Sequence, residues 1–239
     1  MSKVGKNIFK RVIPKFTMKK YAVYALGEIT LLVVGILIAL QINTWNENRK
    51  TDSALKQILY TIQSDLAQDT VAVNRMIYFF DIQDTLCDRF INNEVTLEYI
   101  ENCQYCRNLV AMYLPFNPNK KGYKLLEKFS INHEKRDTVA EDLDRFYNQA
   151  LPLITSSNEM LKEKINNNVK SFEEQDWYVD FIRGEITAEM NEYFANSQDY
   201  RKKVATYKLF AISNHLMILK QYKLSAKLIL EELEERLEE

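Results

Sequence analysis

Three cysteines are the residues whose spacing could do chemistry. Cys103 and Cys106 form a Cys-x-x-Cys pair, and Cys87 lies 16 residues before it. Such a pair serves thiol redox chemistry when it opens a helix after a strand, and it makes half of a zinc site when two further ligands exist. Here the pair falls inside a helix-patterned segment, residues 96–113. We therefore expect a structural disulfide, either Cys103–Cys106 or Cys87 with one of them, with free thiols and redox or metal chemistry as alternatives.

Other catalytic or metal-binding constellations are missing from the sequence. His133 lies in a polar stretch, and His215 has the neighbours of a packed core histidine. The chain has no G-x-S-x-G, H-E-x-x-H or P-loop motif. Aromatic residues at helical spacing could line a ligand groove but fit a core better: Trp177, Tyr178, Phe181, Tyr193 and Phe194. We expect no enzyme, no cofactor and no metal.

The stretch from Ala22 to Ile42 is the element that places the protein. It holds a single charge, Glu28, and at about 1.5 Å per residue it spans roughly 30 Å, the thickness of a hydrocarbon core. Its apolar run is too long for a cleavable signal peptide. We expect a membrane helix over residues 21–44, preceded by a basic leader (residues 1–20) and followed by one water-soluble domain (residues 45–239).

Charge predicts the orientation of this anchor. The leader carries a charge of +7, and the remainder of the chain has 25 basic and 33 acidic residues. Basic residues stay in the cytoplasm, so we expect a cytoplasmic N-terminus, a periplasmic C-terminal domain and a bacterial inner-membrane location. We expect the leader, a topology signal, to lie on the lipid bilayer, with a disordered retention signal as the alternative, and we expect no nucleic-acid partner.

One side of the membrane helix could mediate self-association. Glu28 and Gly35 are seven residues apart and share a face, and Gly35 with Ala39 forms a small-xxx-small pair that permits close helix approach. Glu28, Gly35 and Ala39 are therefore the candidate residues for a homo-oligomer or a protein partner in the membrane. The alternative for Glu28 is a carboxyl group that reaches the interface or is protonated.

The rest of the chain has the pattern of an all-α protein. Only 5 Gly and 4 Pro occur, and apolar residues recur at three- and four-residue steps. We expect helices over residues 45–93, 96–113 (capped by Thr96), 120–129, 138–169 and 197–237, and an aromatic segment over 172–193 broken at Gly184. Pro115 and Pro118 mark a break, and Pro152 could kink its helix. The membrane helix is expected to continue into an antiparallel bundle.

The N-terminal stretch from Tyr24 to Lys50 resembles an uncharacterised family of Bacteroidota membrane proteins. The shared elements are the opening Gly27-Glu28-Ile29, the run from Gly35 to Asn43, and Trp45-Asn46-Glu47. A weaker likeness continues through Tyr123 to Leu126 and Phe146-Tyr147, although a Ser-Gly pair found after the central segment in many relatives is missing. The resemblance implies a single-pass membrane protein and supplies no catalytic residues.

Three functions fit these observations. The first is a non-enzymatic, membrane-anchored helical module that binds a protein or small ligand as a sensor-like, scaffold or accessory subunit. The second is a thiol-redox or other enzyme accessory that uses Cys103 and Cys106. The third is a signalling receptor, which would need a partner because only about 20 residues lie on the cytoplasmic side.

Overall fold

The computed structural model describes residues 15–103, 105–132 and 138–238, and these residues form helices without strands. The elements are α1 (Lys15–Ile91), α2 (Leu97–Asn102), α3 (Lys121–Asn132), α4 (Thr138–Glu173), α5 (Tyr178–Arg183), α6 (Ala188–Asn196), α7 (Gln198–Tyr207), the π-helical segment η1 (Lys208–Leu216) and α8 (Met217–Glu238). The expected all-α fold is confirmed. The basic leader lies largely outside the described residues.

The chain divides into two compact units, Met1–Ala54 and Leu55–Glu239. The first contains the N-terminal part of α1, in which every described residue from Lys20 to Trp45 is exposed. Its apolar stretch is long enough to cross a membrane, and none of its most apolar 18-residue window is buried within the protein. A core helix of a soluble protein would bury such a window, so this helix lacks any apolar partner of its own chain among the described residues.

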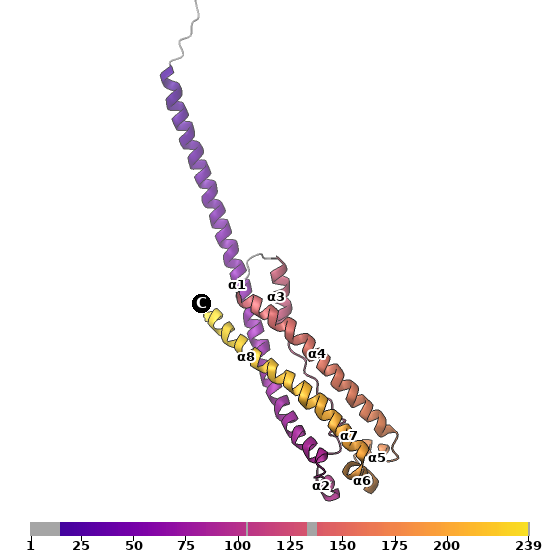
Figure 1. The fold of residues 1–239 in the computed structure, drawn as a ribbon. Coiled ribbons are helices and arrows are strands. Elements are labelled where there is room, and N and C mark those ends of the chain that lie inside the picture. Colours follow the sequence, from indigo (N-terminus) through magenta and orange to yellow (C-terminus); the bar gives the residue numbers. More distant parts are fainter. Residues whose placement is uncertain (1–14, 104, 133–137, 239) are drawn as a thin grey trace, which may run out of the picture. The chain divides into compact units, whose positions relative to one another are not determined.

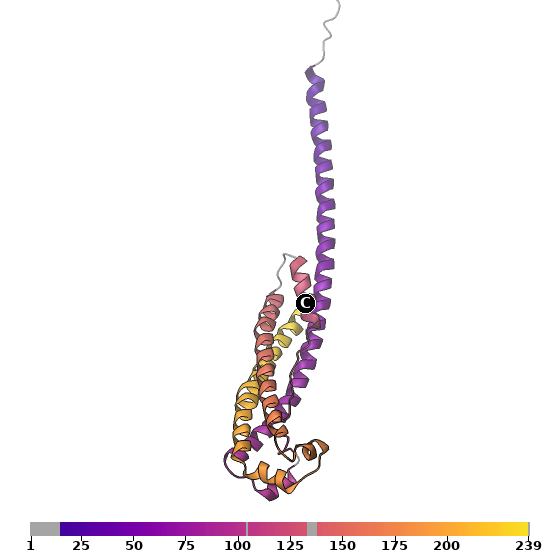
Figure 2. The same ribbon diagram turned by 90° about the vertical axis from the view of Figure 1, so that its right-hand side faces the viewer.

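The second unit is a bundle of three long helices: α1 from Leu55 onward, α4 and α8. In both views α4 and α8 lie side by side (Figures 1 and 2). Pairs such as Ser157 with His215 and Phe146 with Tyr222 show that these two helices run antiparallel. α8 also runs antiparallel to α1. Asp69 of α1 contacts Tyr222, whereas Asp81, further along α1, contacts Lys220, which comes before Tyr222 in α8.

Between α2 and α3 the described chain returns along α4 without forming a helix. Residues 105–120, called here the connecting segment, follow α2 and lead to α3. The side-chain amide of Asn168 donates to the carbonyl of Val110, and that of Asn158 donates to the carbonyl of Phe116. A step of six residues along the segment therefore covers the same distance as a step of ten residues along α4. Ten helical residues rise about 15 Å, which six residues span only when they are extended. This extended return makes α1 and α4 run in the same direction.

Local sequence explains most helix ends. The Thr96 hydroxyl caps α2 by accepting a bond from the Tyr99 N–H, as expected. α5 ends at Gly184, whose φ of 76° is the left-handed conformation that glycine adopts without strain. α4 continues through Pro152 as one helix. The expected last helix begins after Ser197 and contains η1 between two α-helical parts.

Candidate functional site

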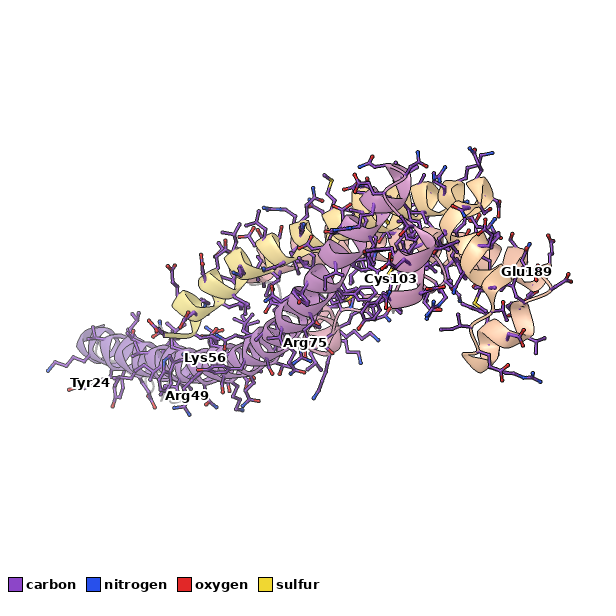
Figure 3. All side chains as sticks on the ribbon, turned by 90° about the horizontal axis from the view of Figure 1, so that it is seen from below. Tyr24, Arg49, Lys56, Arg75, Cys103 and Glu189 are labelled. Carbon is purple, nitrogen blue, oxygen red and sulfur yellow. A yellow bond between two sulfur atoms is a disulfide. The ribbon has the colours of Figure 1, made fainter. Side chains whose placement is uncertain are left out.

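The cysteines form one disulfide. Cys103 and Cys106 are bonded, with their Cα atoms 5.4 Å apart, and Cys87 keeps a buried free thiol. Figure 3 marks Cys103, which directly follows the last residue of α2, Asn102. The predicted helix over residues 96–113 is therefore wrong beyond its first turns.

Tertiary hydrogen bonds explain why that helix stops. The Tyr200 hydroxyl donates to the carbonyl of Cys106, and the Asn168 side chain donates to the carbonyl of Val110. Both donors are buried, so they satisfy carbonyl groups that helical bonds would otherwise need to satisfy. The apolar spacing of residues 96–113 reflects burial of a turn and an extended chain.

Two carboxylates on the core side of α1 hold the end of the connecting segment. Asp69 accepts bonds from the backbone N–H of Asn119 at 3.0 and 3.1 Å and from its side-chain amide at 2.7 Å. One helical turn earlier, Asp65 accepts from the N–H of Gly122 at 2.8 Å. Both acids are almost fully buried. We call Asp65 and Asp69 the acid clamp, because together they fix the entry into α3.

Tyrosines complete this polar layer. The Tyr222 hydroxyl donates to Asp69 at 2.7 Å, while the Tyr147 hydroxyl is buried without a hydrogen-bond partner among the described residues. Burial raises the pKa of Asp69, although its hydrogen bonds oppose the shift. Burial and the nearby carboxylates raise the pKa of Tyr222 and of Tyr147, so both phenols stay protonated.

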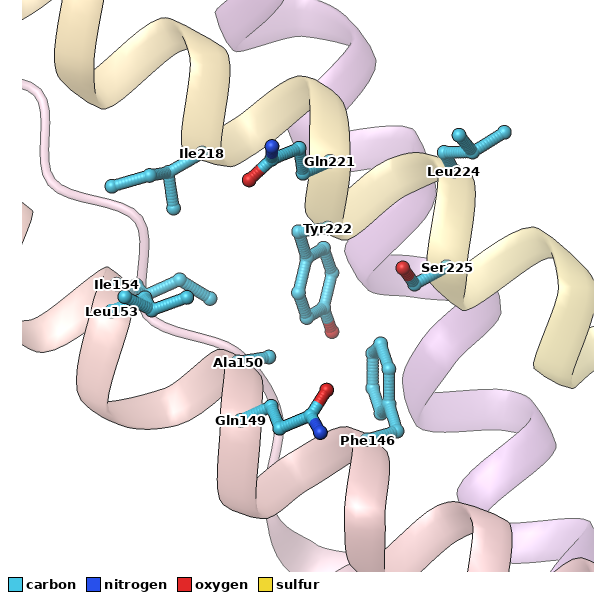
Figure 4. Close-up of a pocket in the computed structure, with 10 residues that line it drawn as sticks. All are labelled: Phe146, Gln149, Ala150, Leu153, Ile154, Ile218, Gln221, Tyr222, Leu224 and Ser225. Carbon is cyan, nitrogen blue, oxygen red and sulfur yellow. The ribbon is translucent and has the colours of Figure 1, made fainter.

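A groove between α4 and α8 opens to solvent in front of this layer. It holds about 330 Å³, and its lining is shown in Figure 4: Phe146, Gln149, Ala150, Leu153, Ile154, Ile218, Gln221, Tyr222, Leu224 and Ser225. Tyr222 is only 3% exposed and links the groove to Asp69 behind it. Apolar walls with two amides and a hydroxyl suit an apolar ligand or a partner side chain.

The groove and the acid clamp were not expected from the sequence. A usable signal existed, because Asp65 and Asp69 occupy the same helical face as Ile62, Leu66 and Val73. A carboxylate inside an apolar stripe needs hydrogen-bond donors from elsewhere in the chain. The groove lacked such a signal, since its shape depends on how α4 and α8 pack.

The remaining predicted residues are placed as follows. Trp177 and Phe194 are buried in an aromatic cluster around Phe172, so the core interpretation is confirmed. His215 is a fully buried core histidine. His133 lies outside the described residues. No group of three His, Cys, Asp or Glu side chains in the described ranges could hold a metal ion.

The three residues predicted to mediate helix association all lie on α1, within its exposed apolar stretch. Glu28, Gly35 and Ala39 are exposed, and no atom of the described chain comes within 4 Å of a Cβ built on Gly35. Their side of the helix is thus open to a neighbouring helix.

His215 sits in η1 and is kept neutral. Its Nδ1 lies 3.0 Å from the Ser157 hydroxyl, its ring contacts Phe80 edge-on at 5.4 Å, and its Nε2 has no hydrogen-bond partner among the described residues. Burial lowers the pKa of His215 to about 4. A charged imidazole there would lack a compensating partner.

Acid is expected to destabilise the bundle through His215. The unfolded imidazole takes up a proton near pH 6.5 and the folded one only near pH 4, so stability is full above pH 6.5 and falls between these values by about 3 kcal/mol. The measurement is urea unfolding at pH 7.5 and at pH 4.5. His215→Gln is the control, and its free energy of unfolding should fall less between the two pH values. An equal fall in both proteins would show that His215 does not cause the acid sensitivity.

Thiol counting is expected to give one reactive cysteine per unfolded chain. Cys87 is buried and its pKa is raised to about 12 by burial, so a maleimide should not label the native protein. Denaturation without a reductant exposes Cys87 alone, and reduction exposes all three. Mass spectrometry of the labelled protein checks this. Rapid labelling of Cys103 and Cys106 after mild reduction of the native protein would indicate an accessible redox pair.

The chain matches a described family over part of its length. Residues 28–125 are similar to a "Family of unknown function (DUF6090)". The matched range contains most of α1, α2, the connecting segment and the start of α3. No match was found among curated proteins.

Proposed function

We propose that this protein is a non-enzymatic, membrane-anchored helical module that binds a protein or small ligand at the bacterial inner membrane. The observation that carries the proposal is the apolar stretch of α1, which is long enough to span a bilayer and wholly exposed. Such a surface is stable in hydrocarbon and unfavourable in water.

Two features support a periplasmic location for the bundle. Seven basic residues precede the apolar stretch. Only three follow it closely, namely Arg49, Lys50 and Lys56. The Cys103–Cys106 disulfide suits an oxidising compartment. In this arrangement the N-terminus lies in the cytoplasm and the bundle outside it.

Two surfaces support a binding role for the protein. Asp69 is bonded by Tyr222 within the bundle, and the α4–α8 groove is lined by apolar groups and amides. In the membrane, the face with Glu28, Gly35 and Ala39 supports close approach of another helix, from a second copy or from a partner.

The second candidate is a thiol-redox accessory, which the disulfide itself favours. Cys106 is fully buried and its carbonyl is bonded by Tyr200, features of a structural bridge. The thiol counting described above separates the two functions.

A topology experiment tests the proposal. A reporter that is active only in the periplasm, fused after Glu239, should be active, and the protein should stay in the membrane pellet after carbonate washing. The double change Val33→Arg and Leu37→Arg should release it, because each arginine at the centre of a membrane helix costs about 3 kcal/mol.

Gln57→Arg is the matched control, since it adds a charge to an exposed position of α1 beyond the apolar stretch. It should leave fractionation unchanged. An inactive reporter would overturn the orientation, and a wild-type protein recovered in the soluble fraction would overturn the anchor.

A further inference from the structure

The outer face of α1 within the bundle carries an apolar stripe, formed by Tyr60, Ala67, Val71, Tyr78 and Ile82. Successive members are seven or four residues apart, which places them on one side of a helix. All five are exposed, Tyr78 by 72%. The core-facing residues of α1, such as Ile62 and Leu66, lie on the opposite side. α1 is therefore apolar on two faces, and the described chain covers only one.

Charge is scarce along this stripe. Among the exposed and half-buried residues of α1 between 60 and 82, Arg75 and Asp81 are the only charged ones, and Figure 3 labels Arg75. An ordinary solvent-facing helix side in a chain with 27% charged residues would carry several. Exposed aromatic residues without charge are the composition of the centre of a protein–protein interface.

We propose that the α1 stripe is a self-association surface on which a second copy of this chain packs its own α1 in parallel. Copies anchored in one membrane point the same way, so their bundles would pair with the two α1 stripes parallel, an orientation that rests on the proposed function. A two-fold pairing then brings each residue against its own equivalent. An uncharged stripe tolerates that pairing, whereas a charged one would face like charge.

A second exposed apolar row of the bundle does not fit this occupant. It runs along α8 through Met217, Leu224 and Leu228, and it is flanked by Lys220 and Lys227. Parallel self-pairing there would bring lysines from both copies together. The α1 stripe from Tyr60 to Ile82 also covers about 33 Å along the helix, a continuous contact over six turns.

Membrane anchoring strengthens such a contact. Confinement of both copies to one bilayer raises their effective concentration, so a modest interface suffices for pairing. The exposed rings of Tyr60 and Tyr78 would provide the anchors, because tyrosine supplies large contact area with few rotatable bonds.

Cysteine cross-linking in the full-length chain tests the proposal. Val71→Cys lies on the stripe, Ala72→Cys is the matched exposed control beside it, and Leu224→Cys reports on the α8 row. Wild type is the background, since Cys87 is buried and the other cysteines are bonded. With a short bis-maleimide in native membranes, Val71→Cys should give a product of twice the chain mass, and neither other variant should.

A second change separates pairing from folding. Tyr78→Glu, made in the Val71→Cys background, places two carboxylates against each other and should weaken pairing about 30-fold while circular dichroism stays unchanged. Equal cross-linking of Val71→Cys and Ala72→Cys, pairing through Leu224→Cys, or a product of another mass would overturn the proposal. The cross-linking is repeated after detergent solubilisation, where pairing does not depend on the membrane. Failure of self-association is thus distinguished from failure of membrane anchoring, which carbonate washing measures.

Discussion

Replacing Gly122 with alanine is expected to destabilise the bundle by about 3 kcal/mol, at the upper end for an overpacked core. A Cβ there would lie 2.6 Å from Cγ1, 2.7 Å from the backbone N and 2.9 Å from Cα of Ile62. Two of these atoms belong to the backbone of α1 and cannot rotate away. α3 would have to shift, which also strains the bond between the Gly122 N–H and Asp65.

Urea unfolding of the full chain in detergent, followed by circular dichroism, measures this change. Lys124→Ala, at an exposed position of the same helix, is the control and should change stability by less than about 0.5 kcal/mol. Adding Ile62→Ala should not rescue Gly122→Ala, because the contacts with the Ile62 backbone remain. Equal stability of Gly122→Ala and Lys124→Ala would show that α3 does not approach α1 this closely.

Asp69→Ala is expected to cost about 4 kcal/mol and to loosen the connecting segment. The change leaves the Asn119 N–H, its side-chain amide and the Tyr222 hydroxyl without their acceptor. The buried Tyr222 hydroxyl without a partner costs about 1–3 kcal/mol, and the part-buried Asn119 groups add the loss of their bonds to a charged acceptor. Asp69→Asn keeps the shape and one acceptor atom, so its loss should be smaller.

Limited trypsin digestion gives a local readout for Asp69→Ala. Lys120 and Lys121 directly follow the residue that Asp69 holds, so cleavage after them should become faster in Asp69→Ala. Asp81→Ala is the control, since Asp81 forms an exposed ion pair with Lys220 worth less than about 1 kcal/mol. Unchanged cleavage at Lys120 and Lys121 would contradict the clamp.

Helices could be predicted where the apolar spacing and the capping residues within a segment determine its structure. α4, the Thr96 cap and the end of α5 at Gly184 follow from apolar spacing and capping chemistry. The long apolar helix at the start of α1 was equally clear, because its length and composition alone define it. The roles of Glu28, Gly35 and Ala39 remain predictions.

The connecting segment and the groove could not be predicted from local pattern. The carbonyl groups of Val110 and Phe116 are held by Asn168 and Asn158, which lie 58 and 42 residues away. The spacing of apolar residues shows which face of a helix or strand is buried. It does not show which distant polar side chain will bond to that element. The π-helical geometry of η1 likewise had no counterpart in the spacing of residues 208–216.

The bond between Asp69 and Tyr222 constrains how the protein is made. The two residues are separated by 153 positions, and α1 is synthesised long before α8. At about 5–20 residues per second, the ribosome needs roughly 8–30 s to deliver Tyr222 after Asp69. During that time the core face of α1, with Leu59 and Leu66, has no α8 to cover it. The core of the bundle can therefore close only after α8 has been made, and α1 cannot complete its packing during synthesis.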